Sequence, residues 1–181
     1  TGELDLNAAN TFAGPLTIDG GSVKVSADFR LGAVPGSATP GNLVLNDGTL
    51  STTASFTLNA NRGGAVGPGQ GGLDVLTNTT LSYGGVIDGA GGLTKSGYGT
   101  LVLSGTNTYT GPTTHTIGFL NLNYSGAART NIIAAASSIT LGGGNASGAA
   151  GGGENVAQLV LAGGAGADAQ SFSGVHSIFG G

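Results

Sequence analysis

The chain contains an internal repeat. When the sequence is compared with itself at an offset of 97 residues, the segment from Gly99 to Asn123 lies over the segment from Gly2 to Ser26. The coinciding glycine, leucine and proline positions are Gly2/Gly99, Leu4/Leu101, Leu6/Leu103, Gly14/Gly111, Pro15/Pro112 and Gly21/Gly118. Two copies of one unit, separated by further short apolar runs, predict a repeat architecture whose neighbouring units share one core.

Each copy consists of short apolar runs joined by polar, glycine-containing corners. In the first copy the runs are Leu4/Leu6, Leu16/Ile18 and Val23/Val25, each alternating with polar residues. Alternation with a period of two predicts strands with one buried face. Strands this short do not form a stable antiparallel pair alone, and neither corner is a two-residue hairpin. We therefore expect a coil in which each turn lays its strands on those of the turn before, about 4.8 Å apart.

The predicted fold class is all-β, a parallel β-helix (β-solenoid) formed as a single segment over residues 1–181. If the offset of 97 residues spans four coils, each coil takes about 24 residues and the chain forms about seven or eight rungs. Leu4/Leu6 and Leu101/Leu103 are then expected in the same sheet. Repeat units are expected at 2–26 and 92–123. Loops are expected at 27–41, which contains two prolines, and at the glycine-rich 142–153.

The second copy resembles a known family. Its motif GGLTKSGYGTLVLSGTNTYTG is similar to the β-strand repeat of bacterial autotransporter passenger domains, closely over 92–123 and more loosely over 2–26. The tail from Asn131 to Gly181 is similar in composition alone. The resemblance implies a right-handed parallel β-helix on a bacterial cell surface, and it supplies no catalytic residues to transfer.

Composition excludes several other classes of protein. Glycine accounts for 38 of 181 residues, which disfavours helices, while the recurrent Val, Leu and Ile clusters supply apolar surface that disordered chains lack. The net charge is −4, and the five basic residues are scattered, which disfavours nucleic acid as a partner. They are Lys24, Arg30, Arg62, Lys95 and Arg129. No apolar run approaches the length of a membrane span, so membrane insertion by this segment is not expected.

Three polar or aromatic positions in the repeat attract attention. Asn10 and Asn107 precede the aromatic residues Phe12 and Tyr109 at corners, which predicts an amide ladder and stacked rings one repeat apart. His115 aligns with the inward-facing Ile18. It is either a buried, hydrogen-bonded imidazole or is turned outward by a bulge that points Ile117 inward, and we expect the bulge.

Two glycine-rich stretches match binding motifs in part. Gly67, Gly69 and Gly72 fit G-x-G-x-x-G, but no predicted helix follows, as dinucleotide binding requires. Residues 163–171 fit a calcium-binding nonapeptide, except that Gln170 replaces a large apolar residue, and one copy supplies only half a site. We interpret both as turns, with Asp168 solvated.

The ionisable residues do not form a recognisable catalytic set. Glu3 and Asp5 share the outer face of a strand, but the other acids are dispersed, and a glycosidase or lyase needs two facing carboxylates. A nucleophilic triad would have to use His115 or His176, because cysteine is absent. The sequence therefore predicts no catalytic, cofactor-binding or metal-binding residues and no cofactor. Sequons at Asn78, Asn123 and Asn145 are assigned no role.

The function expected is a non-enzymatic structural or adhesive segment of an extracellular or surface-anchored bacterial β-solenoid. Such a segment would serve as a stiff stalk or a contact surface, and the expected partners are neighbouring solenoid segments, identical copies end to end, and host or matrix surfaces or glycans. The alternatives are an extracellular filament assembled by end-to-end stacking and a carbohydrate-active β-helix. Thr1-Gly2 corresponds to Tyr98-Gly99, so the chain begins within a repeat, as expected of a fragment.

Overall fold

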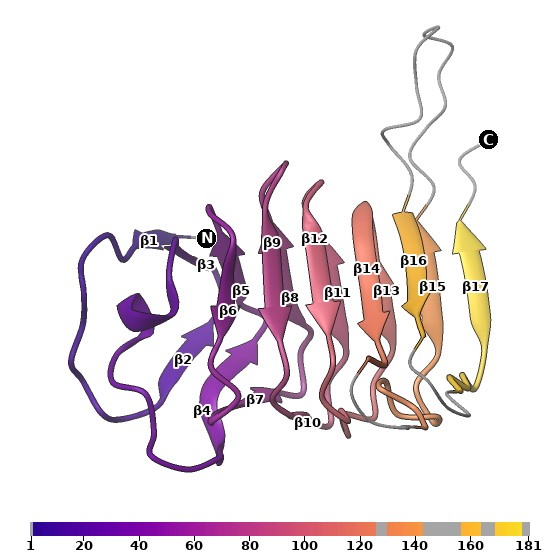
Figure 1. Ribbon diagram of the computed structural model, residues 1–181, viewed down its shortest axis with the longest axis horizontal. Coiled ribbons are helices and arrows are strands. Elements are labelled where there is room, and N and C mark those ends of the chain that lie inside the picture. The colour runs from indigo at the N-terminus through magenta and orange to yellow at the C-terminus, as the bar shows by residue number, and fades with distance from the viewer. Residues whose placement is uncertain (1, 126–129, 143–156, 164–168, 179–181) are drawn as a thin grey trace, which may run out of the picture.

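The computed structural model describes residues 2–125, 130–142, 157–163 and 169–178, which form short strands coiled around one axis (Figure 1). The strands are β1 (Glu3–Asp5), β2 (Leu16–Asp19), β3 (Ser22–Val25), β4 (Thr39–Asn46), β5 (Thr49–Thr52), β6 (Phe56–Leu58), β7 (Arg62–Val66), β8 (Gly71–Val75), β9 (Thr80–Tyr83), β10 (Ile87–Gly89), β11 (Leu93–Ser96), β12 (Thr100–Leu103), β13 (Thr113–His115), β14 (Gly118–Asn123), β15 (Ile139–Gly142), β16 (Ala157–Ala162) and β17 (Val175–Ile178).

The strands form three sheets that are the three faces of a solenoid. Sheet A has the order β1-β3-β5-β8-β11-β13-β15-β17, sheet B the order β10-β7-β4-β2, and sheet C the order β16-β14-β12-β9-β6. All pairings between these strands are parallel, and paired strands are never consecutive in the chain. The predicted all-β parallel solenoid is therefore confirmed.

The coils differ in length. The turn from Glu3 to Ser22 takes 19 residues, whereas the turn from Thr140 to His176 takes 36. Several coils cross the faces of sheets B and C as irregular segments, so these sheets have four and five strands against the eight of sheet A. Sheet A has one strand in each coil, and its eight strands agree with the seven or eight rungs expected from the sequence.

The two copies of the repeat lie on different faces, and this corrects one prediction. Leu4 lies in β1 of sheet A, whereas Leu101 lies in β12 of sheet C. The register of sheet A runs from Glu3 to Thr94, so four coils take 91 residues and the offset of 97 moves the repeat one face onward. The expectation that Leu4/Leu6 and Leu101/Leu103 share a sheet is wrong. Any face suits the unit, because each face requires only alternate apolar residues between glycine corners.

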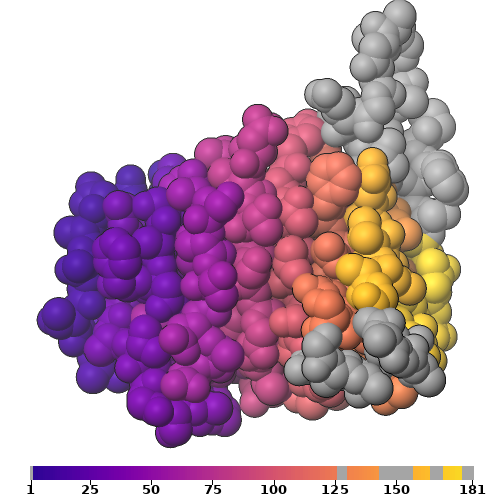
Figure 2. All heavy atoms as spheres, in the orientation of Figure 1, coloured from indigo at the N-terminus to yellow at the C-terminus, as the bar shows by residue number. Residues whose placement is uncertain are grey.

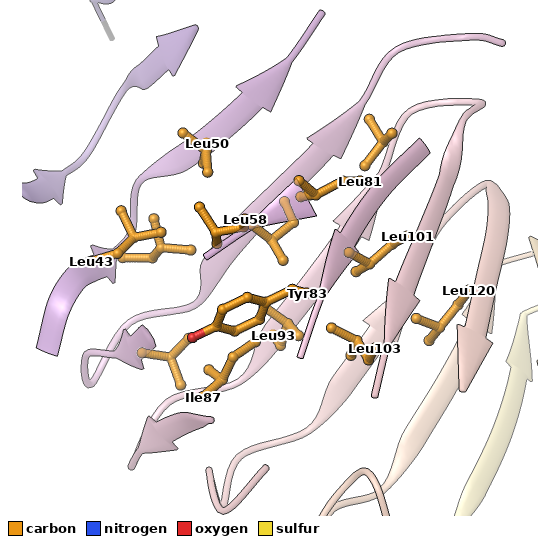
Figure 3. Close-up of a cluster of buried hydrophobic side chains, with 14 of the residues drawn as sticks. Leu43, Leu50, Leu58, Leu81, Tyr83, Ile87, Leu93, Leu101, Leu103 and Leu120 are labelled. Atoms are coloured by element: carbon orange, nitrogen blue, oxygen red, sulfur yellow. The ribbon is translucent and has the colours of Figure 1, made fainter. Parts of the chain in front are cut away.

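One hydrophobic core runs along the axis between the three sheets. Leu101 and Leu103 of the second copy are fully buried, and Leu6 of the first copy packs against the same core. Figure 3 shows side chains from all three sheets converging on it, among them Leu43, Leu50, Leu58, Leu81, Ile87, Leu93 and Leu120. Stacked apolar rows therefore exclude water from the interior of the central coils.

The segment 27–41, which was expected to be a loop, contains regular secondary structure in part. It contains the 3-10 helix η1 (Asp28–Leu31), whose Leu31 is buried in the core, and β4 already begins at Thr39. Pro40 is accommodated because the register between β4 and β7 shifts between Thr39 and Leu43. Of the second expected loop, 142–153, Gly142 ends β15 and 143–153 lie outside the described residues. No helix in the described ranges could cross a membrane.

Glycines at the corners let successive coils approach closely, and on the face seen in Figure 2 the coils touch along the axis. A methyl group at Gly105 would overlap the carbonyl oxygen of Gly85 in the preceding coil, and one at Gly111 would overlap the backbone of Gly91. At a further corner, a methyl group on Gly118 would approach the carbonyl oxygen of Gly97. The high glycine content is therefore a requirement of coil stacking as well as of turn conformation.

We predict that Gly105→Ala lowers the free energy of unfolding by about 1–3 kcal/mol, because the added methyl group forces two coils apart. Gly14→Ala is the control, since a methyl group there has no atom within 4 Å and the residue also lies at a corner, in the first repeat copy. Urea denaturation of the two variants and the wild type measures the difference. Equal stability of both variants would contradict the proposed role of the corner glycines.

Candidate functional surfaces and interior polar groups

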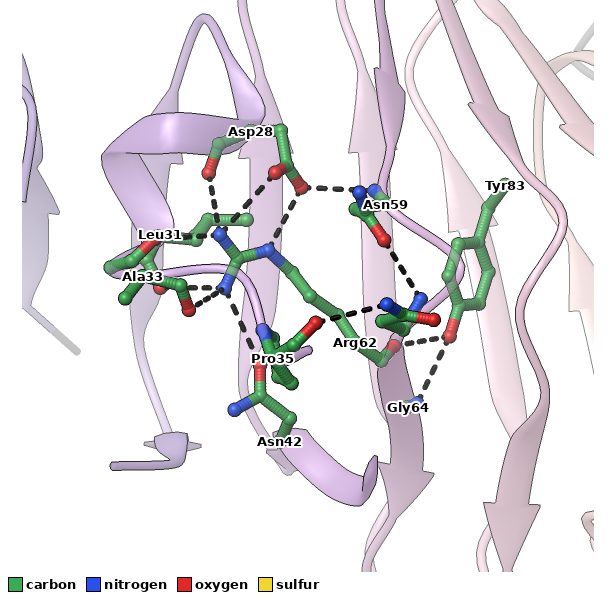
Figure 4. A network of polar contacts seen from close by, with 11 residues as sticks. Asp28, Leu31, Ala33, Pro35, Asn42, Asn59, Arg62, Gly64 and Tyr83 are labelled. Atoms are coloured by element: carbon green, nitrogen blue, oxygen red, sulfur yellow. Dashed lines mark hydrogen bonds and ion pairs between the residues drawn. The ribbon is translucent and has the colours of Figure 1, made fainter. Parts of the chain in front are cut away.

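Arg62 at the start of β7 is a fully buried cation that holds the segment 27–38, which contains η1, against the rest of the solenoid (Figure 4). Its Nε donates to Oδ1 of Asp28 at 2.9 Å, and its side chain is 1% exposed. Its other nitrogens donate to the carbonyl oxygens of Leu31, Gly32 and Ala33 at 3.1, 2.7 and 3.3 Å. A guanidinium suits this position because its planar array of donors satisfies several acceptors at once.

The backbone of Arg62 is held from the next coil by Tyr83. The Tyr83 hydroxyl donates to the carbonyl oxygen of Arg62 and accepts from the amide of Gly64 at 3.1 Å. Burial raises the pKa of Tyr83 to about 12, so the hydroxyl keeps its proton at neutral pH. The network therefore connects three successive coils.

Lys95 and His115 are paired on the neighbouring strands β11 and β13 of sheet A, and both side chains face the core. The Lys95 ammonium donates to the carbonyl oxygens of Ser96, Gly97 and Ile117 at 2.8, 2.6 and 3.1 Å. Nε2 of His115 lies 3.1 Å from the carbonyl oxygen of Gly118. Corner carbonyls therefore supply the partners that make polar side chains tolerable in the core.

Both pKa values are lowered. Burial lowers the pKa of Lys95 to about 8, against a smaller opposing effect of Asp74. Burial, followed by the charge of Lys95, lowers the pKa of His115 to about 4. His115 is completely buried and Ile117 is half-buried, so the expected outward bulge is wrong. The alternation of the strand Leu93–Ser96 is a signal that could have placed Lys95 inside.

The repeat asparagines clamp neighbouring coils. Nδ2 of Asn107 donates to the carbonyl oxygen of Gly105, two residues earlier, at 3.2 Å and to the carbonyl oxygen of Ile132 in the next coil at 2.9 Å. Asn10 makes equivalent bonds to the carbonyl oxygens of Ala8 and Arg30, at 3.2 and 2.8 Å. The two amides thus act separately on their own neighbours, and the predicted ladder between them is not formed.

The aromatic residues that follow these asparagines also differ from the prediction. Tyr109 is fully buried and its hydroxyl lies 2.6 Å from Oγ1 of Thr113, whereas Phe12 is 41% exposed beside Gly32. They are separated by the intervening coils and do not stack. The same repeat position is therefore interior in the second copy and peripheral in the first.

The residues considered for catalysis are dispersed in space. Glu3 and Asp5 share the outer face of sheet A as expected, and Glu3 pairs with Lys24 at 2.6 Å. His115 points into the core, while His176 lies on the outer row of the same sheet, beside Thr140. Within the described ranges, no three His, Asp or Glu side chains are placed to hold a metal ion.

The first partial glycine motif spans a corner and the start of a strand. Gly67 and Gly69 lie between β7 and β8, and Gly72 belongs to β8, so a strand follows the corner and no helix N-terminus is present there for a dinucleotide phosphate. The nonapeptide residue Asp168 and the sequon residue Asn145 lie outside the described residues. Asn78 occupies an exposed corner with a φ of 61° and Asn123 ends β14.

Hydroxyl side chains form a row on the outer face of sheet A. The row is in register from Ser22 through Thr49, Thr94 and Thr114 to Thr140, with Gly72 between Thr49 and Thr94. In the adjacent row, the Asp74 carboxylate accepts from Ser51 at 2.9 Å and from Ser96 at 3.2 Å. This face is consequently polar, repetitive and partly charged.

Comparison with known families agrees with this architecture. The family described as passenger-associated-transport-repeat matches residues 1–25 and 93–114, which coincide with the two repeat copies in the sequence. These two segments are passenger-associated transport repeats. The match confirms the resemblance drawn from the sequence, both the close one at 92–123 and the looser one at 2–26.

The chain is also similar over part of its length to an autotransporter adhesin. The adhesin BmaC autotransporter of Brucella suis biovar 1 (strain 1330) is 40% identical over 113 residues, covering 60% of this chain and 3% of the adhesin. The chain therefore spans a small fraction of the length of the relative that it matches. No solved structure matches the chain.

We predict that Arg62→Ala lowers the free energy of unfolding by about 3–5 kcal/mol, because the Asp28 carboxylate and several buried carbonyls lose their donor. Lys24→Ala is the matched control, since it removes an exposed ion pair with Glu3, whose side chains are 34% and 53% exposed. Chemical denaturation should leave the control near wild-type stability. A comparable loss in both variants would contradict a special role for the buried pair.

We further predict that stability rises with pH in two windows. The folded protein holds His115 at a pKa of about 4 against 6.5, and Lys95 at about 8 against 10.5, so the unfolded chain binds more protons in both intervals. Unfolding free energy should rise between pH 4 and 6.5, by at most about 3 kcal/mol from His115, and again between pH 8 and 10.5.

The variant His115→Leu isolates the lower window, because leucine occupies the adjoining interior position at Leu141. The carboxylates titrate in both proteins, so the difference between their stability curves reports His115. This difference should change between pH 4 and 6.5 and stay level between pH 8 and 10.5. A difference independent of pH throughout would refute the assignment.

Proposed function

We propose that this chain is a non-catalytic segment of a surface-exposed autotransporter passenger, and that it acts as a rigid shaft and an adhesive contact surface. The observation that carries the proposal is the continuous parallel stacking of short strands around one core, in a chain with two segments that match passenger repeats. The adhesin name of the matching Brucella protein supports the adhesive part. An extracellular or cell-surface location follows from the same proposal.

Rigidity arises from the way the coils are joined. Each interior coil pairs its backbone with the coils on both sides, and Arg62, Lys95 and Asn107 add side-chain bonds across coils. Stability in such a solenoid is approximately a sum over coils and their interfaces. A shaft of this kind also resists proteolysis, because its strands offer few locally unfolded segments.

The absence of an enzymatic role is part of the proposal. Among the described residues, the carboxylate of Glu3 is engaged by Lys24 and that of Asp28 by Arg62, and the two histidines lie on opposite faces of sheet A. These placements disfavour a carbohydrate-active β-helix, which needs an acid and a base on either side of a bound sugar.

End-to-end assembly is a second candidate, favoured by the ends of sheet A. Among the described residues, the strands β1 and β17 are each paired on one side, and the exposed fractions of Leu4 and Val175 are 53% and 64%. Unpaired strand edges can template pairing with another copy. Electron microscopy of the purified chain distinguishes filaments from short separate rods.

The adhesive proposal is tested by displaying the chain on a non-adherent bacterium and counting cells attached to host-cell or matrix surfaces. The carrier without the chain is the control, and protease resistance verifies that the displayed chain is folded. We expect several-fold greater attachment than with the carrier alone. Attachment equal to that of the carrier, with the chain folded, would refute the adhesive role.

A further inference from the structure

Charged residues are distributed unevenly over the three sheets. Sheet A strands carry Glu3, Asp5, Lys24, Asp74, Lys95, His115 and His176, and sheet B strands carry Asp19, Arg62 and Asp88. The strands of sheet C contain no Asp, Glu, Lys, Arg or His. One face of the solenoid is therefore built from uncharged strands alone.

The outer surface of sheet C combines hydrogen-bonding and apolar side chains in register. One row runs from Thr80 through Thr100 and Phe119 to Gln158. The adjacent row places Val102 and Val160 on either side of Asn121. Phe119 is 40% and Val160 39% exposed, and Figure 2 views the molecule from this side.

We propose that the outer face of sheet C binds a linear, uncharged polysaccharide whose chain lies along the solenoid axis. The inference rests on the adhesive function proposed above and names its contact face and partner class. Threonine hydroxyls and the Gln158 amide can both donate and accept, which matches sugar hydroxyls. Phe119 and Val160 offer apolar surface to the C–H faces of sugar rings.

Charge favours this partner over the charged alternatives. Binding nucleic acid or an acidic glycan requires Lys or Arg to replace released counterions, and the strands of sheet C supply neither. Burying this face against a neutral polymer leaves no unpaired ion behind, so it avoids the largest desolvation cost of association.

Periodicity favours a polymer over a small sugar. Strands of neighbouring coils are about 4.8 Å apart, so equivalent positions such as Thr80 and Thr100 recur along the axis. A repeating ligand engages several of these weak positions at once, and its second and later contacts are intramolecular. Affinity should therefore rise steeply with the length of the glycan, and short oligosaccharides should compete poorly.

The test is co-sedimentation of the full chain with insoluble neutral polysaccharides and with one acidic polysaccharide, at low and high salt. Thr100→Lys places a charge at the centre of sheet C. Thr114→Lys is the matched control, because Thr114 is also outward-facing, half-buried and on a strand that is paired on both sides. Thermal melting confirms that both variants fold.

We expect salt-insensitive binding to at least one neutral polysaccharide, at least tenfold weaker binding by Thr100→Lys, and unchanged binding by Thr114→Lys. Equal losses in both variants, binding to the acidic polymer alone, or equally strong competition by short and long glycans would overturn the inference. So would light scattering that shows a dimer which Thr100→Lys dissociates, because a second copy would then occupy the face.

Failure of every neutral polysaccharide to bind the wild-type chain also overturns the inference. It leaves the adhesive function intact if the displayed chain still increases attachment of cells. Loss of attachment in the display experiment, with the chain folded, instead removes the adhesive function itself. The two experiments therefore separate a wrong partner from a wrong function.

Discussion

The structure depends on keeping successive coils at the spacing of paired β-strands, about 4.8 Å, at the corners as well as along the faces. Strands meet this requirement through backbone hydrogen bonds, but a corner side chain would collide with the corner beneath it. Gly105 over Gly85 and Gly111 over Gly91 remove that collision. Because all three sheets share the same axis, a corner that cannot close would disturb the register of every face, which explains why glycine is so abundant in a chain with a continuous core.

Stacking also determines how polar groups enter the interior. Several corners present carbonyl oxygens that accept hydrogen bonds from buried side chains. Lys95 bonds three such oxygens, Asn107 bonds two, and Arg62 ties the η1 segment to β7. The bonds from Lys95 to Ile117, from Asn107 to Ile132 and from Arg62 to Gly32 join neighbouring coils. They fix the position of one coil on the next, which the leucine rows alone do not specify.

Because the interior and the corners meet the needs of folding, the outward positions of each sheet are free to vary. Sheet A presents threonine and serine in rows interrupted by charges, whereas sheet C presents uncharged amide, hydroxyl and apolar groups. A repeating scaffold with chemically distinct faces is well suited to many weak contacts, since each additional coil adds equivalent positions to the same surface. The proposed adhesive function uses this property directly.

Local pattern alone established that the chain folds as short alternating strands with glycine corners in a parallel coil, because period-two hydrophobicity and corner composition depend on neighbouring residues only. The same alternation predicts which side chains of most strands point outward. The residue identities alone show that β9, β12 and β14 carry no charge. Tertiary structure alone decided which face receives each strand, since that depends on coils of 19 to 36 residues whose corners vary in length. This is why Leu4 and Leu101 occupy different sheets, why His115 faces inward beside Lys95, and why Arg62 finds Asp28 across 34 residues. Contacts between residues that far apart carry no periodic signal in the sequence.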